Sequence, residues 1–196
     1  MLSEKLKRFH IILASSSPRR QEFLKKLGLE YEIRLKPIKE IYPGHLKGAE
    51  IADYLSKLKA APFLGELKPN DLLITSDTVV WHKDTFLGKP ADSEQAFSML
   101  RSMSGDLHEV ITSVCFTRTN DQRLVSSNTQ VKFRELTDEE IWHYIEESKP
   151  YDKAGGYGIQ DWIGLIGIEE IKGSYTNVVG LPTQLVYKTL MALSCQ

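Results

Sequence analysis

The sequence predicts an α/β protein with an elongated mixed β-sheet, flanked by helices, and two lobes around a central cleft. Strand-like and helix-like segments alternate over about the first hundred residues, as in chains whose parallel strands are joined by helices. Two strand-like runs, 107–119 and 123–133, then follow each other around Asn120 and Asp121 and predict an antiparallel hairpin. Alternation resumes afterwards. A chain of 196 residues fits one domain spanning 1–196, with a substantial core.

The first predicted unit is a strand, a serine-rich turn and a helix. Residues 9–14 form a short apolar run with two β-branched side chains, which is typical of a buried strand. Ser17 suits the residue that caps a helix, and Pro18 suits the first helical position. Gly28 follows where a left-handed residue would end that helix.

Arg19 and Arg20 stand in the first turn of this helix, which is the unfavourable end for a cation. Each should cost roughly 0.3–1 kcal/mol beside the positive end of the helix dipole. An anion bound there would remove that cost, because free N–H groups, serine hydroxyls and guanidiniums all bind phosphate or carboxylate. The alternative is that both arginines pair with surface acids. The stretch is not a P-loop, since the glycines and the Lys-Ser/Thr pair are absent.

The remaining elements follow from hydrophobic periodicity and helix caps. A short strand is expected at 31–35 and a helix at 48–63. Further strands are expected at 71–82, 86–90, 107–119, 123–133 and 163–171, and further helices at 93–103, 137–147 and 182–193. Segments 150–160 and 174–181 are expected to be loops.

Asp77 is the first candidate for chemistry, because it interrupts an apolar strand that is covered on both faces. A carboxylate there is costly unless it is paired, hydrogen-bonded or bound to a metal. A metal ligand or general base is favoured over a structural aspartate. Lys89 lies across the next hairpin and suits either a cross-strand ion pair or a phosphate contact. Lys59, on local evidence alone, is more typical of a solvated helix charge.

The glycine-rich segment 150–160 predicts a loop whose backbone approaches a ligand closely. Lys153 and Gln160 are its polar candidates. The Gln160 amide could bind a base edge, because it has both a donor and an acceptor, or it could satisfy loop backbone groups. His108 is more typical of an ordinary strand histidine than of a metal ligand, since no partner stands at metal-ligand spacing.

Bulk composition excludes several classes of function. The net charge of −1 gives no field that would attract nucleic acid or an anionic membrane. Two cysteines predict neither a disulfide framework nor a metal site, so a reducing cytoplasm is the expected location. No apolar run approaches the roughly 18 residues of a membrane span. Serines, arginines, lysines and a buried aspartate together indicate a nucleotide or phosphorylated metabolite as ligand.

Several motifs, in order, resemble the Maf family of nucleoside triphosphate pyrophosphatases. They are LASSSPRR at 13–20, SDTVV at 76–80, LGKP at 87–90, SGDLHEVITSV at 104–114, DKAGGYGIQ at 152–160 and GSYTNVVGLP at 173–182. The resemblance implies a fold similar to the inosine triphosphate pyrophosphatases. It also implies hydrolysis of a nucleoside triphosphate to the monophosphate and pyrophosphate, aided by Mg²⁺, Mn²⁺ or Co²⁺, as a means of cleaning nucleotide pools.

The resemblance also assigns roles to residues. Asp77 matches the proton acceptor, and Glu40 with Asp77 matches the metal site. Phosphate-contacting positions match Ser15, Arg20, Lys59 and Lys89, and positions for base choice match Arg19, Thr78 and Gln160. Lys153 is expected as a further substrate contact from its place in the glycine-rich loop, not from the resemblance. This set is similar to the branch that acts on dTTP, UTP and modified pyrimidine triphosphates.

Two alternatives stay open. One is a pyrophosphatase for 7-methyl-GTP, against which Arg19 and Gln160 argue. The other is a non-catalytic, nucleotide-binding regulator of cell division, which would need Ser15 and the arginines but not Asp77. The expected partner is the nucleoside triphosphate alone, without nucleic acid or membrane, and a homodimer is left open.

Overall fold

The computed structural model describes residues 1–195, and its centre is one seven-stranded mixed sheet. The strands are β1 (His10–Leu13), β2 (Glu32–Ile33), β3 (Asp71–His82), β4 (Thr85–Leu87), β5 (Leu107–Thr117), β6 (Gln122–Phe133) and β7 (Ile168–Lys172). Their order is β2-β1-β3-β5-β6-β7, with β4 paired to β3 outside this path. β1 runs parallel to β2 and β3, and the other pairs are antiparallel. The predicted mixed α/β sheet is confirmed.

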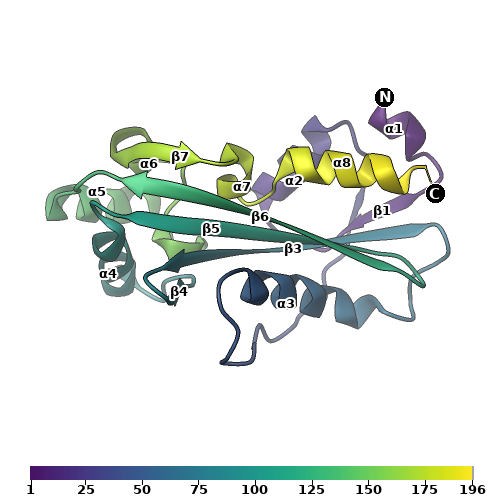
Figure 1. The fold of residues 1–196 in the computed structure, drawn as a ribbon, viewed down its shortest axis with the longest axis horizontal. Helices are drawn as coiled ribbons and strands as arrows, with labels where there is room; N and C mark the ends of the chain where they lie inside the picture. Colours follow the sequence, from purple (N-terminus) through teal and green to yellow (C-terminus); the bar gives the residue numbers. More distant parts are fainter. Residues whose placement is uncertain (196) are drawn as a thin grey trace.

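Helices cover both faces of this sheet (Figure 1). They are α1 (Leu2–Lys5), α2 (Pro18–Lys26), α3 (Ala49–Ala60), α4 (Ser93–Met103), α5 (Asp138–Ser148), α6 (Trp162–Gly167), α7 (Tyr175–Val179) and α8 (Thr183–Leu193). Short 3-10 turns occupy Ala61–Phe63 and Ala154–Gly156. The ends of the chain lie close together, where α1 meets α8.

Alternation along β3 divides the core between the two faces, because successive strand side chains point to opposite sides. Leu72 and Ile74 pack with α2 and α8, whereas Val79 packs with α3. Farther along the sheet, Val80 joins a separate core with α4 and α5. The sheet in Figure 1 is accordingly long, with one apolar core toward each end.

Most predicted elements are confirmed, and the exceptions have local causes. The strand expected at 163–171 is wrong over its first half, where α6 forms instead and only β7 is extended. The backbone packs there so tightly that a Cβ on Gly164 would lie 1.9 Å from the carbonyl oxygen of Ile159. The loop expected at 174–181 contains α7, because the Ser174 hydroxyl accepts from the Asn177 N–H at 3.3 Å and caps it.

A gap in the sheet positions the cleft. On one edge of β3, β1 pairs with residues 71–74 and β4 pairs with residues 80–82. Residues 75–79 have no strand beside them on that edge, while β5 pairs with β3 on the other edge throughout this stretch. Asp77 stands at the middle of the gap. The polar interruption in the strand therefore coincides with the opening between the two predicted lobes.

Candidate active site

Two adjoining cavities, of about 410 Å³ and about 620 Å³, open at the gap in β3. Residues from distant parts of the chain line both: Ser17, Arg19, Arg20, Glu40, Lys59, Lys89 and Asp152. The smaller cavity adds Asp77, Thr78, Lys153 and Gln160, and the larger adds Ser15. The structure thus brings every residue predicted for the site to one connected cleft.

Asp77 and Glu40 meet at the ammonium group of Lys59. Lys59 Nζ contacts Asp77 Oδ1 and lies 3.1 Å from Glu40 Oε1. Asp77 is only 6% exposed, and this burial raises the pKa of its carboxyl, although the positive charge of Lys59 opposes the rise. No backbone N–H within residues 1–195 donates to Asp77, which disfavours the structural alternative. The interpretation of Lys59 as a solvated helix charge is wrong.

The same two carboxylates test whether a divalent cation fits here. Mg²⁺ in phosphate-handling sites is commonly held by one or two carboxylates, and phosphate and water oxygens complete its shell. Glu40 and Asp77 already converge on one cationic group, so their chemistry fits a hard cation. Over the described part of the chain, no group of three or more His, Cys, Asp or Glu side chains gathers at metal-ligand spacing. A cation at this point would therefore depend on further oxygen ligands, such as those of phosphate and water.

Arg20 binds the stretch of β3 that has no strand beside it on one edge, and it is not a free surface charge. Its Nη1 donates to the Ser76 carbonyl at 2.8 Å and its Nη2 to Thr78 Oγ1 at 3.0 Å. Its Nε donates to the Gly180 carbonyl at 2.9 Å. Burial lowers the pKa of Arg20, and the negative charge of Asp77 opposes this. Because Ser76 and Thr78 flank Asp77, the guanidinium fixes the backbone that carries the candidate base. The alternative of pairing with a surface acid is wrong for Arg20.

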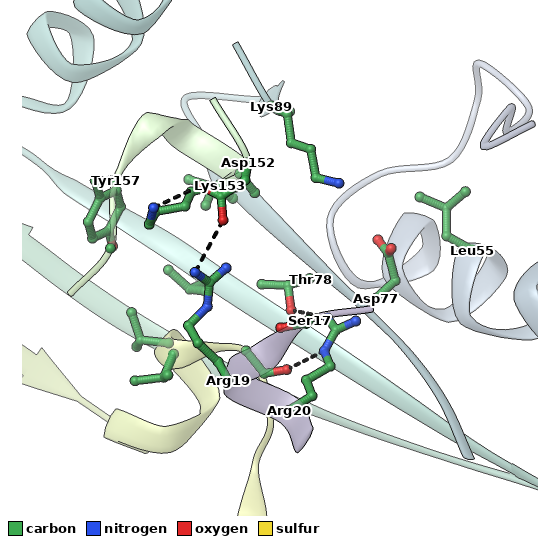
Figure 2. A pocket seen from close by; sticks show the side chains of 18 of the residues that line it. Ser17, Arg19, Arg20, Leu55, Asp77, Thr78, Lys89, Asp152, Lys153 and Tyr157 are labelled. Atoms are coloured by element: carbon green, nitrogen blue, oxygen red, sulfur yellow. Dashed lines mark hydrogen bonds and ion pairs between the residues drawn. The ribbon is translucent and has the colours of Figure 1, made fainter. Parts of the chain in front are cut away.

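Arg19 crosses the cleft to an acidic residue that sequence reasoning missed. Arg19 Nη1 lies 3.4 Å from Asp152 Oδ2, and Lys153 Nζ lies 2.7 Å from Asp152 Oδ1 (Figure 2). Burial by itself would raise the pKa of Asp152, but the positive charges of Lys153 and Arg19 lower it overall. The sequence could have indicated Asp152 as a site residue, since it directly precedes Lys153 in the predicted binding loop. For Arg19 the predicted acidic partner exists, but it lines the cleft.

Two serines of the first turn have different surroundings from those expected. Ser17 precedes α2 as predicted, yet its hydroxyl does not cap the helix and instead lines the cleft. Ser15 is buried, and its Oγ accepts from the Ser17 N–H at 3.2 Å. The hydroxyl of Ser17 is therefore an additional polar group in the cavity, which its interpretation as a cap concealed.

Lys89 and Gln160 are exposed at the site, as are Glu40 and Asp152. In Figure 2 the Lys89 ammonium and the Asp77 carboxylate both point into the cavity. Lys89 makes no ion pair with any residue between 1 and 195, so of its two alternatives the cross-strand ion pair with Asp77 does not form. A cation without a protein counter-charge at a cavity wall is available to an anionic ligand.

An apolar wall forms another part of the smaller cavity. It contains Val80, Val110, Tyr157, Val178 and Val179, and Gln160 lies at the same cavity. The Tyr157 hydroxyl is bonded to His108 Nε2 at 2.7 Å, inside the core. The cleft thus combines cationic and apolar parts of its lining, as a phosphorylated molecule with a flat organic part requires.

Fold and cleft together define a binding site for a phosphorylated small molecule, and comparison with known proteins names the family. Residues 10–193 match the family model described as Maf-like protein. The chain is 56% identical over 193 residues to the dTTP/UTP pyrophosphatase of Flavobacterium johnsoniae, covering 98% of this chain and 100% of that protein. It is 50% identical to the dTTP/UTP pyrophosphatase of Phocaeicola vulgatus, covering 97% and 99%. The chain belongs to the Maf-like family, as the motifs predicted.

Among solved structures, the chain is similar to the Ham1 protein of Staphylococcus aureus, with a TM-score of 0.44 and 12% identity over 63% of this chain and 71% of that one. It is also similar to a nucleoside-triphosphatase, dITP/XTP pyrophosphatase, of Mycobacterium abscessus, with a TM-score of 0.42 and 10% identity over 95% and 97%. Within residues 1–195, no helix is both long and apolar enough to cross a membrane.

Proposed function

We propose that this protein hydrolyses dTTP, UTP and modified pyrimidine triphosphates to the nucleoside monophosphate and pyrophosphate. The observation that carries the proposal is the buried Asp77 at the gap in β3, held by Lys59 at the edge of a cationic cleft. Relatives that share 46–57% of their residues with this chain are named dTTP/UTP pyrophosphatases. Their similarity spans nearly the whole chain, so the site as a whole is comparable.

The cleft suggests how the substrate lies. The space that suits the phosphate chain is lined by the expected phosphate contacts Ser15, Arg20, Lys59 and Lys89. The valine-rich wall and Gln160 suit the base, because a pyrimidine offers a flat apolar face and an edge of donors and acceptors. A triphosphate bound this way would bring its α-phosphorus toward Asp77, between the two ends of the cleft.

The chemistry then follows from the groups present. Asp77 takes a proton from a water molecule as the water oxygen bonds to the α-phosphorus. The bond from the α-phosphorus to the bridging oxygen breaks, and pyrophosphate leaves with its electron pair. Lys59 and Lys89 stabilise the negative charge that grows on the departing oxygens. A divalent cation held by Glu40 and Asp77 would neutralise further phosphate charge when bound.

Burial supports Asp77 in this role. A carboxylate in water is a weak base near neutral pH, whereas one whose pKa is raised by burial accepts a proton more readily. The positive charge of Lys59 opposes the rise in the pKa and favours the ionised form, which a base requires. Arg20 fixes the strand on both sides, so that the carboxylate keeps its direction.

The proposal is tested by incubating the protein with dTTP, UTP, CTP and 7-methyl-GTP in Mg²⁺ or Mn²⁺ and measuring pyrophosphate separately from orthophosphate. Pyrophosphate from dTTP and UTP is expected. Release from 7-methyl-GTP alone would assign the protein to the other branch and contradict the role of Gln160. Nucleotide binding without release of either product would favour the regulator of cell division.

A further inference from the structure

The hydroxyl of Thr78 starts a directed chain of hydrogen bonds that leads away from the cleft. Thr78 Oγ1 accepts from Arg20 Nη2 and lies 2.9 Å from Thr112 Oγ1. The Thr112 hydroxyl donates to the Asn177 carbonyl at 3.0 Å. Because a hydroxyl has one proton, the Thr112 proton goes to Asn177 and Thr78 must donate to Thr112. The order Arg20, Thr78, Thr112, Asn177 is thereby set.

Asn177 is the anchor at the far end of this chain. Its side chain is fully buried, and Nδ2 donates to the Val110 carbonyl at 2.8 Å and to Thr129 Oγ1 at 2.9 Å. The Val110 carbonyl can only accept, so the orientation of the amide is fixed. Asn177 Oδ1 has no hydrogen-bond partner within residues 1–195. A buried carbonyl oxygen without a hydrogen-bond partner costs folding free energy. The two hydrogen bonds of Nδ2 keep the Asn177 side chain in this position.

This anchor holds one wall of the cleft. Val178, Val179 and Gly180 directly follow Asn177, and all three line the smaller cavity. The Gly180 carbonyl is held by Arg20 Nε at 2.9 Å. The segment is therefore bound at both ends, by Asn177 to β5 and β6 and by Arg20 to α2. Val110, whose carbonyl receives the amide, lines the same apolar end of the cavity.

We propose that Thr112 and Asn177 are positioning residues that set the wall against which the nucleobase lies, and thereby set base selectivity. Neither residue lines the cavity, so neither touches the substrate. This inference rests on the proposed function for the identity of the ligand. It adds that selectivity among bases depends on a buried threonine and a buried asparagine behind the binding surface, in addition to the side chains that meet the base.

Thr112→Val tests the proposal, because valine has nearly the shape of threonine without its hydroxyl. Thr112→Ser keeps the hydroxyl and is the conservative rescue. Thr117→Val is the matched control, since Thr117 is equally buried on β5, and within residues 1–195 its hydroxyl bonds only to Cys115 and Gln122, away from the cleft. Each variant is compared by kcat/KM for dTTP and for CTP, and by inhibition with pyrophosphate, after circular dichroism confirms folding.

Thr112→Val is expected to lower the dTTP-to-CTP ratio of kcat/KM about five- to tenfold through KM, which corresponds to loss of one positioning hydrogen bond. Inhibition by pyrophosphate should stay unchanged, because Lys59 and Lys89 are untouched. Thr112→Ser should restore the ratio, and Thr117→Val should leave it at the wild-type value. An equal fall for both substrates, or an unchanged ratio in Thr112→Val, would overturn the proposal.

Two further measurements keep the outcome decisive. If Thr112→Val does not fold, Asn177→Asp replaces it, because a carboxylate oxygen would then face the Val110 carbonyl and displace the wall at nearly constant volume. Affinities for the α,β-methylene analogues of dTTP and CTP, measured by calorimetry, report base selectivity without turnover. If the wild-type protein fails to cleave dTTP, the proposed function fails, while a changed ratio of analogue affinities in the variant still supports the positioning role.

Discussion

Replacing His108 with glutamine should weaken the loss of stability that the protein undergoes in mild acid. His108 is 1% exposed, and burial lowers its pKa from 6.5 to about 3, with a smaller effect from the nearby His82. In the unfolded chain the same imidazole would bind a proton below about pH 6.5. The unfolded state therefore binds more protons than the folded state in this range, and the free energy of unfolding falls as the pH falls.

The size of the effect follows from the two pKa values of His108. At about pH 5 the imidazole lies about one and a half pH units below its unfolded pKa, at about 1.4 kcal/mol for each unit. His108 should therefore reduce the free energy of unfolding by about 2 kcal/mol at about pH 5, and by almost nothing at about pH 7.5. Glutamine can still bond to the Tyr157 hydroxyl but does not titrate.

Urea unfolding followed by tryptophan fluorescence, at about pH 7.5 and at about pH 5, measures this difference. The wild-type protein should lose about 2 kcal/mol more than His108→Gln between the two pH values. Contributions from other titrating groups, including Asp77, are common to both proteins and cancel. Parallel losses in the two proteins would show that His108 has a similar pKa in the folded and unfolded states, and would refute the reasoning.

Three other substitutions have clear expected outcomes. Asp77→Asn should reduce dTTP turnover roughly 10²- to 10⁴-fold with an unchanged circular dichroism spectrum; near-normal turnover would rule out its role as the base. In Arg20→Lys the lysine cannot reach all three acceptors that the guanidinium binds, so urea unfolding should show that the free energy of unfolding falls by roughly 1–3 kcal/mol. Equal stability of the two proteins would contradict the conclusion that Arg20 holds β3 in place. Gly164→Ala places a Cβ against the Ile159 carbonyl and should lower stability by about 3 kcal/mol, whereas an unchanged melting temperature would contradict the tight packing.

Local patterns predicted the elements whose signals lie within a few neighbouring residues. β3 and α4 have the bounds that periodicity and flanking turns indicate. The capping box of Thr137 and Glu140 forms at the start of α5. Pro18 opens α2, and Gly28 follows that helix with a φ of 76°. In each case the deciding interaction is between residues adjacent along the chain.

Signals that depend on distant residues were not predictable. The helix α6 was missed for a local reason, since its apolar run gives no period and the close approach of Gly164 to Ile159 is visible only in the folded chain. The acceptors of Arg20 lie 56 to 160 residues farther along the sequence. The gap that exposes Asp77 depends on which strands pair with β3. Residue types therefore indicated the site, but its internal bonding required the fold.

Hydrolysis of dTTP in water enriched in ¹⁸O, followed by mass spectrometry of the products, tests the central claim most directly. The account predicts that water attacks the α-phosphorus next to Asp77, so one ¹⁸O atom should appear in dTMP and none in pyrophosphate. Label in pyrophosphate would mean attack at the β-phosphorus, and labelled orthophosphate would mean cleavage at the γ-phosphorus. Either result would contradict the arrangement of Asp77, Lys59 and Lys89 proposed for this cleft.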